Sequence, residues 1–324
     1  MTEKTAVVLV AHGTVESLDD LPSLLANIRR GHPAPPDLVA EVRRRYEAIG
    51  GRSPLNDVSR ALAEKLEARL GIPVRMAMRL FHPYPKDVLS RLAKAGVKKI
   101  VVVPLAQHSA HVYGDAVKEA ARDVAPELQV TSAPNWGRQP GLTRAFAAVI
   151  RAALERIPAE ERKRTALVLT AHSLPVSVIE AGDPYEREVR ASAEDVVGAL
   201  GAGVFAEHGV AFQSQGMGTG PGGRPMKWLG PDLRGTFEGL AARGMKHVVV
   251  APIGFLADHV EIFYDLDIEA KGWAHELGFE LYRSASLNAG DGLLDVLETV
   301  ARETDKGSGE GPPRLRGDEQ GGPR

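Results

Sequence analysis

The sequence contains no cysteine among its 324 residues. This absence excludes disulfide bonds, thiolate zinc sites, iron–sulfur clusters held by cysteine and catalysis by a cysteine nucleophile. Any metal ion that the protein handles must therefore meet histidine, carboxylate or other oxygen ligands. Aromatic residues are also few, at 5%, but hydrophobic residues reach 44% and charged residues 25%, which is typical of a globular protein.

Neither sign of charge dominates, and no hydrophobic run is long. Lysine plus arginine is 40 and aspartate plus glutamate is 42, so the net charge is −2. No global positive field therefore attracts nucleic acid or an anionic membrane. The apolar run at residues 6–11 is too short for a signal-peptide core, and no stretch approaches the ~20 apolar residues of a membrane span. We expect a cytoplasmic protein with no nucleic-acid partner and no membrane span.

Short β-branched runs alternate with longer helical patterns, which predicts an α/β fold of parallel sheets flanked by helices. The expected strands are residues 6–10, 74–78, 100–103, 166–170, 210–213 and 247–251. The expected helices are residues 55–70, 86–95, 142–154, 185–200 and 232–242. The stretch 306–324 is rich in glycine, proline and charge, and we expect it to be a disordered tail.

Two internal repeats divide the chain. Residues 5–13 (TAVVLVAHG) match residues 165–173 (TALVLTAHS) at six of nine positions, and GVKKIVVVP at 96–104 resembles GMKHVVVAP at 244–252. The second repeat continues, because His111-Val112-Tyr113 aligns with His259-Val260-Glu261. The sequence therefore predicts two similar Rossmann-like halves, residues 1–150 and 151–305, with an active-site cleft between them at the carboxyl ends of the strands.

His172 and His12 occupy equivalent places in the two halves, each directly after a predicted strand. A lone histidine at such a place is more commonly a core residue bonded to a backbone carbonyl. The matching His12, and the chain break at Ser173-Leu174-Pro175, favour a site at the strand ends instead.

Glu261, Asp265 and Glu269 recur at every fourth residue, so they line one face of a helix that is expected to begin at Asp258. A row of this kind is commonly a solvated acidic surface, and the alternative is a track for a hard cation. In a regular helix His259 and Glu261 would point about 200° apart, so they share a site only if the first turn is irregular.

Basic clusters at residues 28–31 (IRRG) and 43–46 (RRRY) have two interpretations. They are either surface charge or a clamp for carboxylates, which arginine binds through two parallel hydrogen bonds. The glycines at 216–223 do not have the spacing of a dinucleotide-binding loop, so nothing indicates NAD.

Four motifs stand together in this chain. They are IRRG at 28–31 with RYEAIGGRSPL at 45–55, AHSLP at 171–175 with GDPY at 182–185, QS at 213–214 leading to WLGP at 228–231, and DHVE at 258–261 with YDLD at 264–267. In this combination the chain resembles the ferrochelatases, enzymes of the lyase class that insert ferrous iron into a porphyrin during haem biosynthesis. The resemblance extends from Val7 to about Ala301 and is strongest to the soluble bacterial type that acts on coproporphyrin III, with protoporphyrin IX as the other candidate ring.

This resemblance implies roles for particular residues. His172 and Glu261 correspond to the catalytic pair at the point of metal insertion, and Asp265 and Glu269 continue as the metal path in the C-terminal half. A porphyrin-side lip belongs to the N-terminal half, where the expected substrate contacts are Arg29, Arg45, Tyr46 and Ser53. His12 joins them, because it stands where the coproporphyrin type usually has a tyrosine that ligates the product iron.

The resemblance also implies partners. Ferrous iron and a porphyrin are substrates, no tightly bound cofactor or iron–sulfur cluster is expected, and enzymes of the haem pathway are expected to make transient contacts. The A-H-G-T motif at residues 11–14 resembles the corresponding motif of sirohydrochlorin chelatases, which place a histidine there, so a cobalt or nickel chelatase is one alternative. A haem carrier that uses His12 as axial ligand is another, although a carrier has no need of the acidic row.

Overall fold

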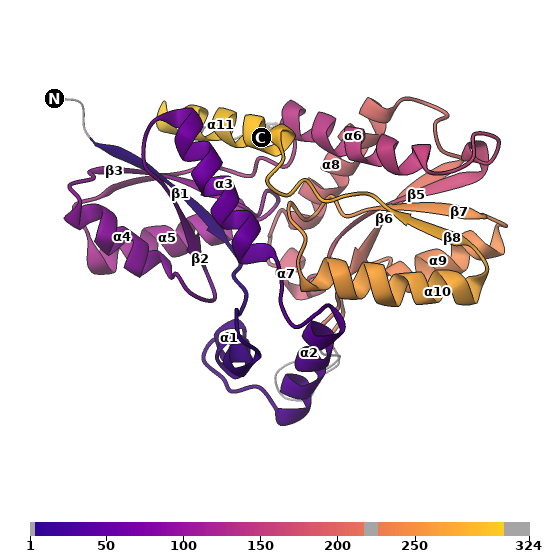
Figure 1. The fold of residues 1–324 in the computed structure, drawn as a ribbon, viewed down its shortest axis with the longest axis horizontal. Coiled ribbons are helices and arrows are strands. Elements are labelled where there is room, and N and C mark those ends of the chain that lie inside the picture. The colour runs from indigo at the N-terminus through magenta and orange to yellow at the C-terminus, as the bar shows by residue number, and fades with distance from the viewer. Residues whose placement is uncertain (1–3, 217–225, 308–324) are drawn as a thin grey trace, which may run out of the picture.

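The computed structural model describes residues 4–216 and 226–307. It contains two four-stranded parallel sheets that lie side by side, with strand orders β2-β1-β3-β4 and β6-β5-β7-β8 (Figure 1). Helices cover both sheets, so the predicted α/β fold with two Rossmann-like halves is confirmed. Most of the expected glycine-rich loop and of the expected tail, residues 217–225 and 308–324, lie outside the described part of the chain.

The two sheets follow the two sequence repeats. The strands of the first sheet are β1 (Thr5–Ala11), β2 (Val74–Met78), β3 (Lys99–Pro104) and β4 (Gln129–Ser132). Those of the second are β5 (Thr165–His172), β6 (Glu207–Gln213), β7 (His247–Ala251) and β8 (Glu280–Arg283). The central strands β1 and β5 are buried over nearly their whole length, since helices cover both faces of each sheet.

Helices make up most of the remaining described chain. They are α1 (Leu21–Ile28), α2 (Pro36–Ala48), α3 (Leu55–Leu70), α4 (Pro85–Lys94), α5 (Ala110–Val124), α6 (Pro140–Glu155), α7 (Val176–Glu180), α8 (Tyr185–Leu200), α9 (Leu233–Ala242), a π-helix (Ile262–Ala270), α10 (Lys271–Leu277) and α11 (Asp291–Asp305), with short 3₁₀ turns at Leu18–Asp20 and Arg162–Arg164. Within the described residues, no helix combines the length and apolarity needed to cross a membrane.

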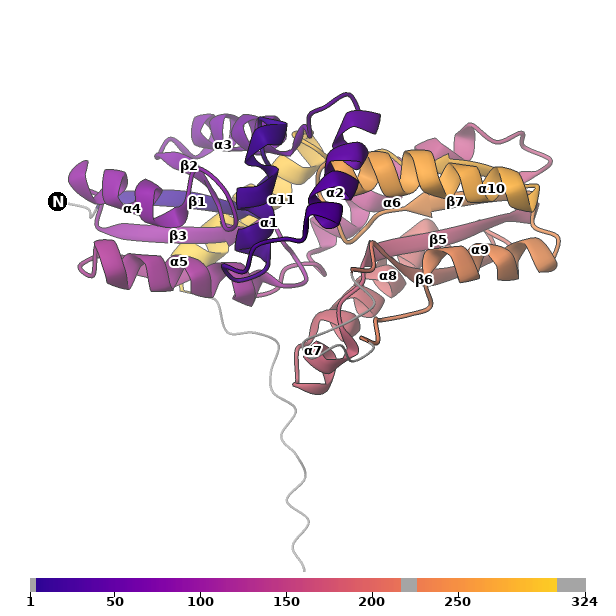
Figure 2. The same cartoon turned by 90° about the horizontal axis from the view of Figure 1, so that it is seen from below.

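Helices exchanged between the halves hold the two sheets together. The C-terminal helix α11 packs on β3, β4 and α3 of the first half, whereas α6, from the first half of the sequence, packs on β7, β8 and α8 of the second. One hydrophobic core therefore runs through both halves, and it includes Val7 and Leu9 of β1 together with Leu167 and Leu169 of β5. Figure 2 shows the two halves in line along the long axis of the molecule.

Helices α1 and α2 stand apart from both sheets at the junction of the halves (Figures 1 and 2). They share a small cluster of buried residues that includes Leu21, Leu24 and Tyr46, and Phe81 of the β2–α4 loop packs against it. The helix pair therefore projects beside the carboxyl ends of the strands, where a lip over a substrate would stand.

Some elements have the bounds that the sequence pattern predicts, whereas others are not predicted by it, among them the long helices α2, α5 and α11. Strands at 74–78 and 247–251 and helices at 55–70 and 185–200 have the expected bounds. The pattern misses β4 and β8, which are four-residue edge strands with partly exposed side chains, so they lack the aliphatic run that marks a buried strand.

Gly254, just after β7, has no room for a side chain. A Cβ there would lie 2.6 Å from the Cα of Ala171, next to His172 on β5. We predict that Gly254→Ala lowers the free energy of unfolding by about 1–3 kcal/mol, because the backbone must shift to relieve the clash. Urea unfolding measures this change.

Gly272→Ala is the matched control for this substitution. Gly272 lies in α10, and no atom lies within 4 Å of the position that its Cβ would take. A gain of about 0.5–1 kcal/mol is expected there, since alanine favours a helix more than glycine does. Equal stability of Gly254→Ala and the unsubstituted protein would contradict the close approach of Gly254 to Ala171 of β5.

Candidate active site

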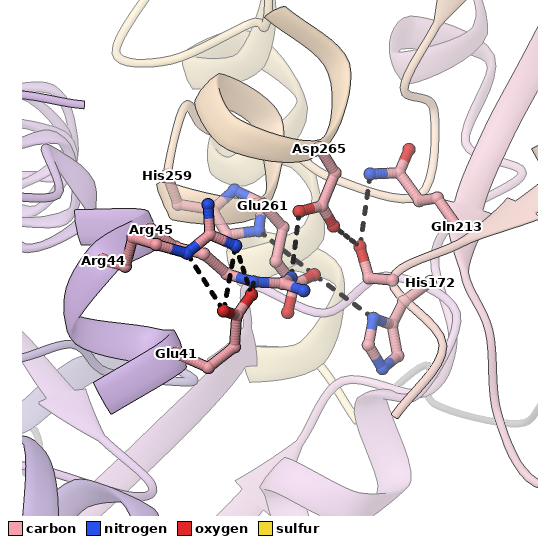
Figure 3. A network of polar contacts seen from close by, with 9 residues as sticks. Glu41, Arg44, Arg45, His172, Gln213, His259, Glu261 and Asp265 are labelled. Carbon is pink, nitrogen blue, oxygen red and sulfur yellow. Dashed lines mark hydrogen bonds and ion pairs between the residues drawn. The ribbon is translucent and has the colours of Figure 1, made fainter. Parts of the chain in front are cut away.

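Glu261 lies between two imidazoles at the carboxyl ends of the second sheet. Its Oε2 is 3.2 Å from Nδ1 of His172, the last residue of β5, and 3.7 Å from Nε2 of His259 (Figure 3). The structure therefore brings together His172 and Glu261, which the sequence places 89 residues apart.

The turn before Glu261 explains why His259 shares this site. Residues 258 and 259 precede the helix, so His259 and Glu261 are not part of one regular helical turn. Asp258 fixes the turn, since its backbone N–H donates to Asn288 Oδ1 at 2.8 Å and its carboxylate accepts from Ser286 Oγ at 2.7 Å. The irregular first turn that the sequence argument required is present.

A π-helix, rather than the expected α-helix, carries the acidic row onward from Glu261. π-helical turns are rare and are frequent at functional sites. Asp265 accepts a hydrogen bond from Ser214 Oγ, and its Oδ1 lies 3.4 Å from Nη1 of Arg45 on the projecting helix α2 (Figure 3). The acidic row thus contacts both β6 and the lip.

The row ends in a pocket of about 160 Å³. Its lining residues are Arg45, Phe212, Gln213, Ser214, Gln215, Asp232, Leu233, Arg234, Asp265, Glu269 and Trp273. Asp265 and Glu269 therefore face a cavity next to the His172–Glu261 pair. Among the described residues, no group of three or more histidines and carboxylates has the geometry to hold a metal ion.

Charge and burial shift the pKa values along this row. Burial alone would raise the pKa of Glu261, but the imidazoles of His172 and His259 hold it well below its usual range. Burial would lower the pKa of His172, and the adjacent Glu261 carboxylate raises it overall. Burial and the nearby Glu261 charge raise the pKa of Asp265 to about 7. The pair is thus a carboxylate that stays ionised beside an imidazole that readily takes a proton.

The first half contributes His12, directly after β1. Its side chain is exposed to solvent on one edge, and its Nδ1 lies 3.2 Å from the hydroxyl of Tyr113. The pKa of His12 is lowered to about 4, chiefly because the surrounding protein desolvates the imidazole, while Glu261 opposes the shift and the charges of His172 and Arg79 add to it. His12 is therefore a neutral imidazole within electrostatic reach of the His172–Glu261 pair.

The side chains of the other expected substrate contacts, Tyr46, Ser53 and Arg29, are less exposed to solvent than that of His12. The Tyr46 hydroxyl is buried and lies 2.6 Å from Thr14 Oγ1, and Ser53 is buried, its Oγ accepting the Leu55 N–H at 3.4 Å. Arg29 is partly buried at the end of α1. The structure therefore brings Arg45 to the acidic row, but it does not bring Tyr46 or Ser53 into contact with His172.

Three further residues complete the site. Tyr185 donates a hydrogen bond from its hydroxyl to the backbone carbonyl of His172 at 2.9 Å, Ser214 binds Asp265, and Tyr113 binds His12. Tyr185 lies in the GDPY motif, Ser214 in the QS motif and Tyr113 in the second repeat. No sequence signal distinguishes these three side chains from their neighbours.

The raised pKa of Asp265 generates a prediction about stability. The unfolded chain loses this proton near pH 4 and the folded protein near pH 7, so the free energy of unfolding falls as pH rises between these values. Between pH 5 and pH 7 the fall attributable to Asp265 is on the order of 3 kcal/mol, at about 1.4 kcal/mol for each pH unit. We predict that Asp265→Asn removes it, as measured by urea unfolding at pH 5 and pH 8.

The exposed Asp115→Asn on α5 is the control for this comparison and should keep the pH dependence of the unsubstituted protein. If Asp265→Asn keeps that dependence too, Asp265 does not hold its proton near neutral pH.

Comparisons with known proteins agree with this geometry. Residues 4–305 match the family model described as Ferrochelatase. The chain is 34% identical over 310 residues to the ferrochelatase of Herpetosiphon aurantiacus, covering 93% of this chain and 99% of that protein. It is also 34% identical over 313 residues to the coproporphyrin III ferrochelatase of Geobacillus kaustophilus, covering 93% and 96%.

Among solved structures, SirB from Bacillus subtilis with Fe³⁺ shares the fold, with a TM-score of 0.58 at 15% identity, over 95% of this chain and 98% of that one. The cobalt complex of the sirohydrochlorin chelatase SirB from Bacillus subtilis subspecies spizizenii has a TM-score of 0.55 at 14% identity, with the same coverage. At these identities the likeness concerns the fold alone. The family model, which matches nearly the whole chain, and the relatives above 30% identity establish that this protein belongs to the ferrochelatase family.

Proposed function

We propose that this protein inserts ferrous iron into a porphyrin, as a step of haem biosynthesis, and that coproporphyrin III is its ring. The observation that carries the proposal is the contact between His172 and Glu261 beside a row of carboxylates, in which Asp265 is buried and Glu261 and Glu269 are partly exposed. The names of several relatives support the choice of ring. We expect the enzyme to act as a lyase in the cytoplasm and to contact other enzymes of the haem pathway transiently.

Metallation requires a base, because two pyrrole N–H protons must leave the ring before four nitrogens bind the metal. His172 is suited to accept them one at a time, since a histidine changes charge near neutral pH and this partly exposed imidazole can release the first proton to solvent before it takes the second. An ionised Glu261 only accepts hydrogen bonds, so Nδ1 of His172 carries the hydrogen in their 3.2 Å contact. This leaves Nε2 of His172 to face the ring and take a proton, while Glu261 stabilises the resulting imidazolium.

Ferrous iron must also lose its water. Glu261, Asp265 and Glu269 offer oxygen ligands in sequence, which replace water without holding the metal as tightly as thiolates would. Arg45 occupies part of this row through its 3.4 Å contact with Asp265. We assign Asp265 and Glu269 to metal entry from the pocket and Glu261 to its last step.

The lip formed by α1 and α2 is the proposed porphyrin side. Arg29 and Arg45 are suited to pair with propionate carboxylates, and Tyr46 and Ser53 shape the wall behind them. Arg45 also pairs with Glu41 at 2.9 Å, so a propionate would compete with carboxylates already present. His12 is proposed to face the ring from the first half and to ligate the iron of the product.

A sirohydrochlorin chelatase is the second candidate, because His12 lies in an A-H-G-T stretch and the fold matches SirB. We predict that the purified protein inserts Fe²⁺ anaerobically into coproporphyrin III faster than into protoporphyrin IX, with sirohydrochlorin slower than either. Absorbance changes of each ring measure the rates side by side. Metallation of sirohydrochlorin alone would replace the proposed function by the second candidate.

We predict that His172→Ala lowers the rate of Fe²⁺ or Zn²⁺ insertion by a factor of about 10² to 10⁴, the usual contribution of a general base. The exposed His275→Ala on α10 removes an imidazole that is not among the residues lining the pocket, and it should retain the full rate. A His172→Ala variant with nearly unchanged turnover would exclude His172 as the proton acceptor.

A further inference from the structure

Each half of the protein carries a histidine paired with a polar side chain, and the two pairs occupy equivalent positions. His12 directly follows β1 and His172 is the last residue of β5, and each of these strands is the second in the order of its own sheet. Tyr113 and Glu261 each stand third in an aligned H-V-x stretch that follows β3 or β7. The repeats that relate the halves therefore relate His12 to His172 and Tyr113 to Glu261.

The structure gives the two pairs the same geometry. Nδ1 of His12 lies 3.2 Å from the Tyr113 hydroxyl, and Nδ1 of His172 lies 3.2 Å from Oε2 of Glu261. In both pairs the same ring nitrogen faces its partner, which leaves Nε2 on the opposite edge of each ring. The histidines that begin the two aligned H-V-x stretches, His111 and His259, have different partners. Nε2 of His259 lies 3.7 Å from Glu261, whereas Nε2 of His111 lies 3.2 Å from Asp183.

The two partners give the imidazoles different chemistry. Glu261 is a carboxylate and favours a proton on His172. Tyr113 is a phenol, which is uncharged at neutral pH and so provides no such charge. The guanidinium of Arg79 stacks over the Tyr113 ring at 5.6 Å, and the Arg79 backbone N–H donates to Ala11 O at 2.8 Å, which fixes the phenol beside His12.

We infer that Tyr113 is a positioning residue for His12, accepting its Nδ1–H so that the unprotonated Nε2 faces the ring and ligates the metal of the metallated product. Under this inference the equivalent imidazoles of the two repeats serve as a proton acceptor in the second half and as a metal ligand in the first. The inference rests on the proposed function, because it requires a metalloporphyrin as product. Its chemistry is ordinary, since haem iron commonly takes an imidazole ligand and such imidazoles commonly donate their other N–H to a fixed partner.

The test uses preformed iron coproporphyrin, so it does not depend on insertion. The titrations compare the unsubstituted protein, His12→Ala, Tyr113→Phe and the control Tyr282→Phe, whose hydroxyl binds Glu280 on β8. We expect the His12→Ala complex to lose the absorption spectrum of an imidazole-ligated iron. Tyr113→Phe should weaken iron coproporphyrin binding by about 10- to 100-fold and shift its spectrum toward that of His12→Ala, while Tyr282→Phe matches the unsubstituted protein.

A direct measurement of the tautomer makes the inference independent of the variants. Nitrogen-15 NMR of histidine-labelled protein without porphyrin should show His12, assigned by its loss in His12→Ala, with the hydrogen on Nδ1. A hydrogen on Nε2, or a Tyr113→Phe complex with the spectrum and affinity of the unsubstituted protein, would overturn the role of Tyr113. Failure of the proposed function is distinct, because it is an absence of metal insertion by the unsubstituted protein.

Discussion

The contact of the Glu261 carboxylate with two imidazoles is the interaction on which the site depends. A buried carboxylate is costly unless neighbouring groups compensate its charge. His172 and His259 do so from two sides, while Tyr185 fixes the backbone of His172. The same charge raises the pKa of Asp265, the next carboxylate of the row. Proton uptake at His172 is therefore electrostatically linked to the protonation of the carboxylates in the acidic row.

Much of this arrangement follows from the sequence. The two halves and their parallel sheets are readable from the alternation of aliphatic strands and amphipathic helices, and the ligand-binding edge follows from the rule that parallel strands end at one side. His172 and Glu261 stand out because each lies at a repeated position after a strand. Their proximity needs only the adjacency of β5 and β7, which the fold provides.

Other features are not readable from one sequence, for physical reasons. The spacing of Glu261, Asp265 and Glu269 suits an α-helix, and the choice of a π-helix depends on tertiary contacts such as the ion pairs of Arg283 with Asp258 and Asp267. The exchange of α6 and α11 leaves no mark on helical periodicity, since an amphipathic face does not specify which sheet it covers.

That exchange of helices has a mechanical consequence. Because α11 covers part of the first sheet and α6 part of the second, the halves cannot swing apart as hinged bodies without exposing the apolar layer they share. Neither half could be excised as a self-sufficient unit, although each repeats the other. The small cluster of buried residues in α1 and α2 is separate from that layer, so these two helices can shift without exposing it.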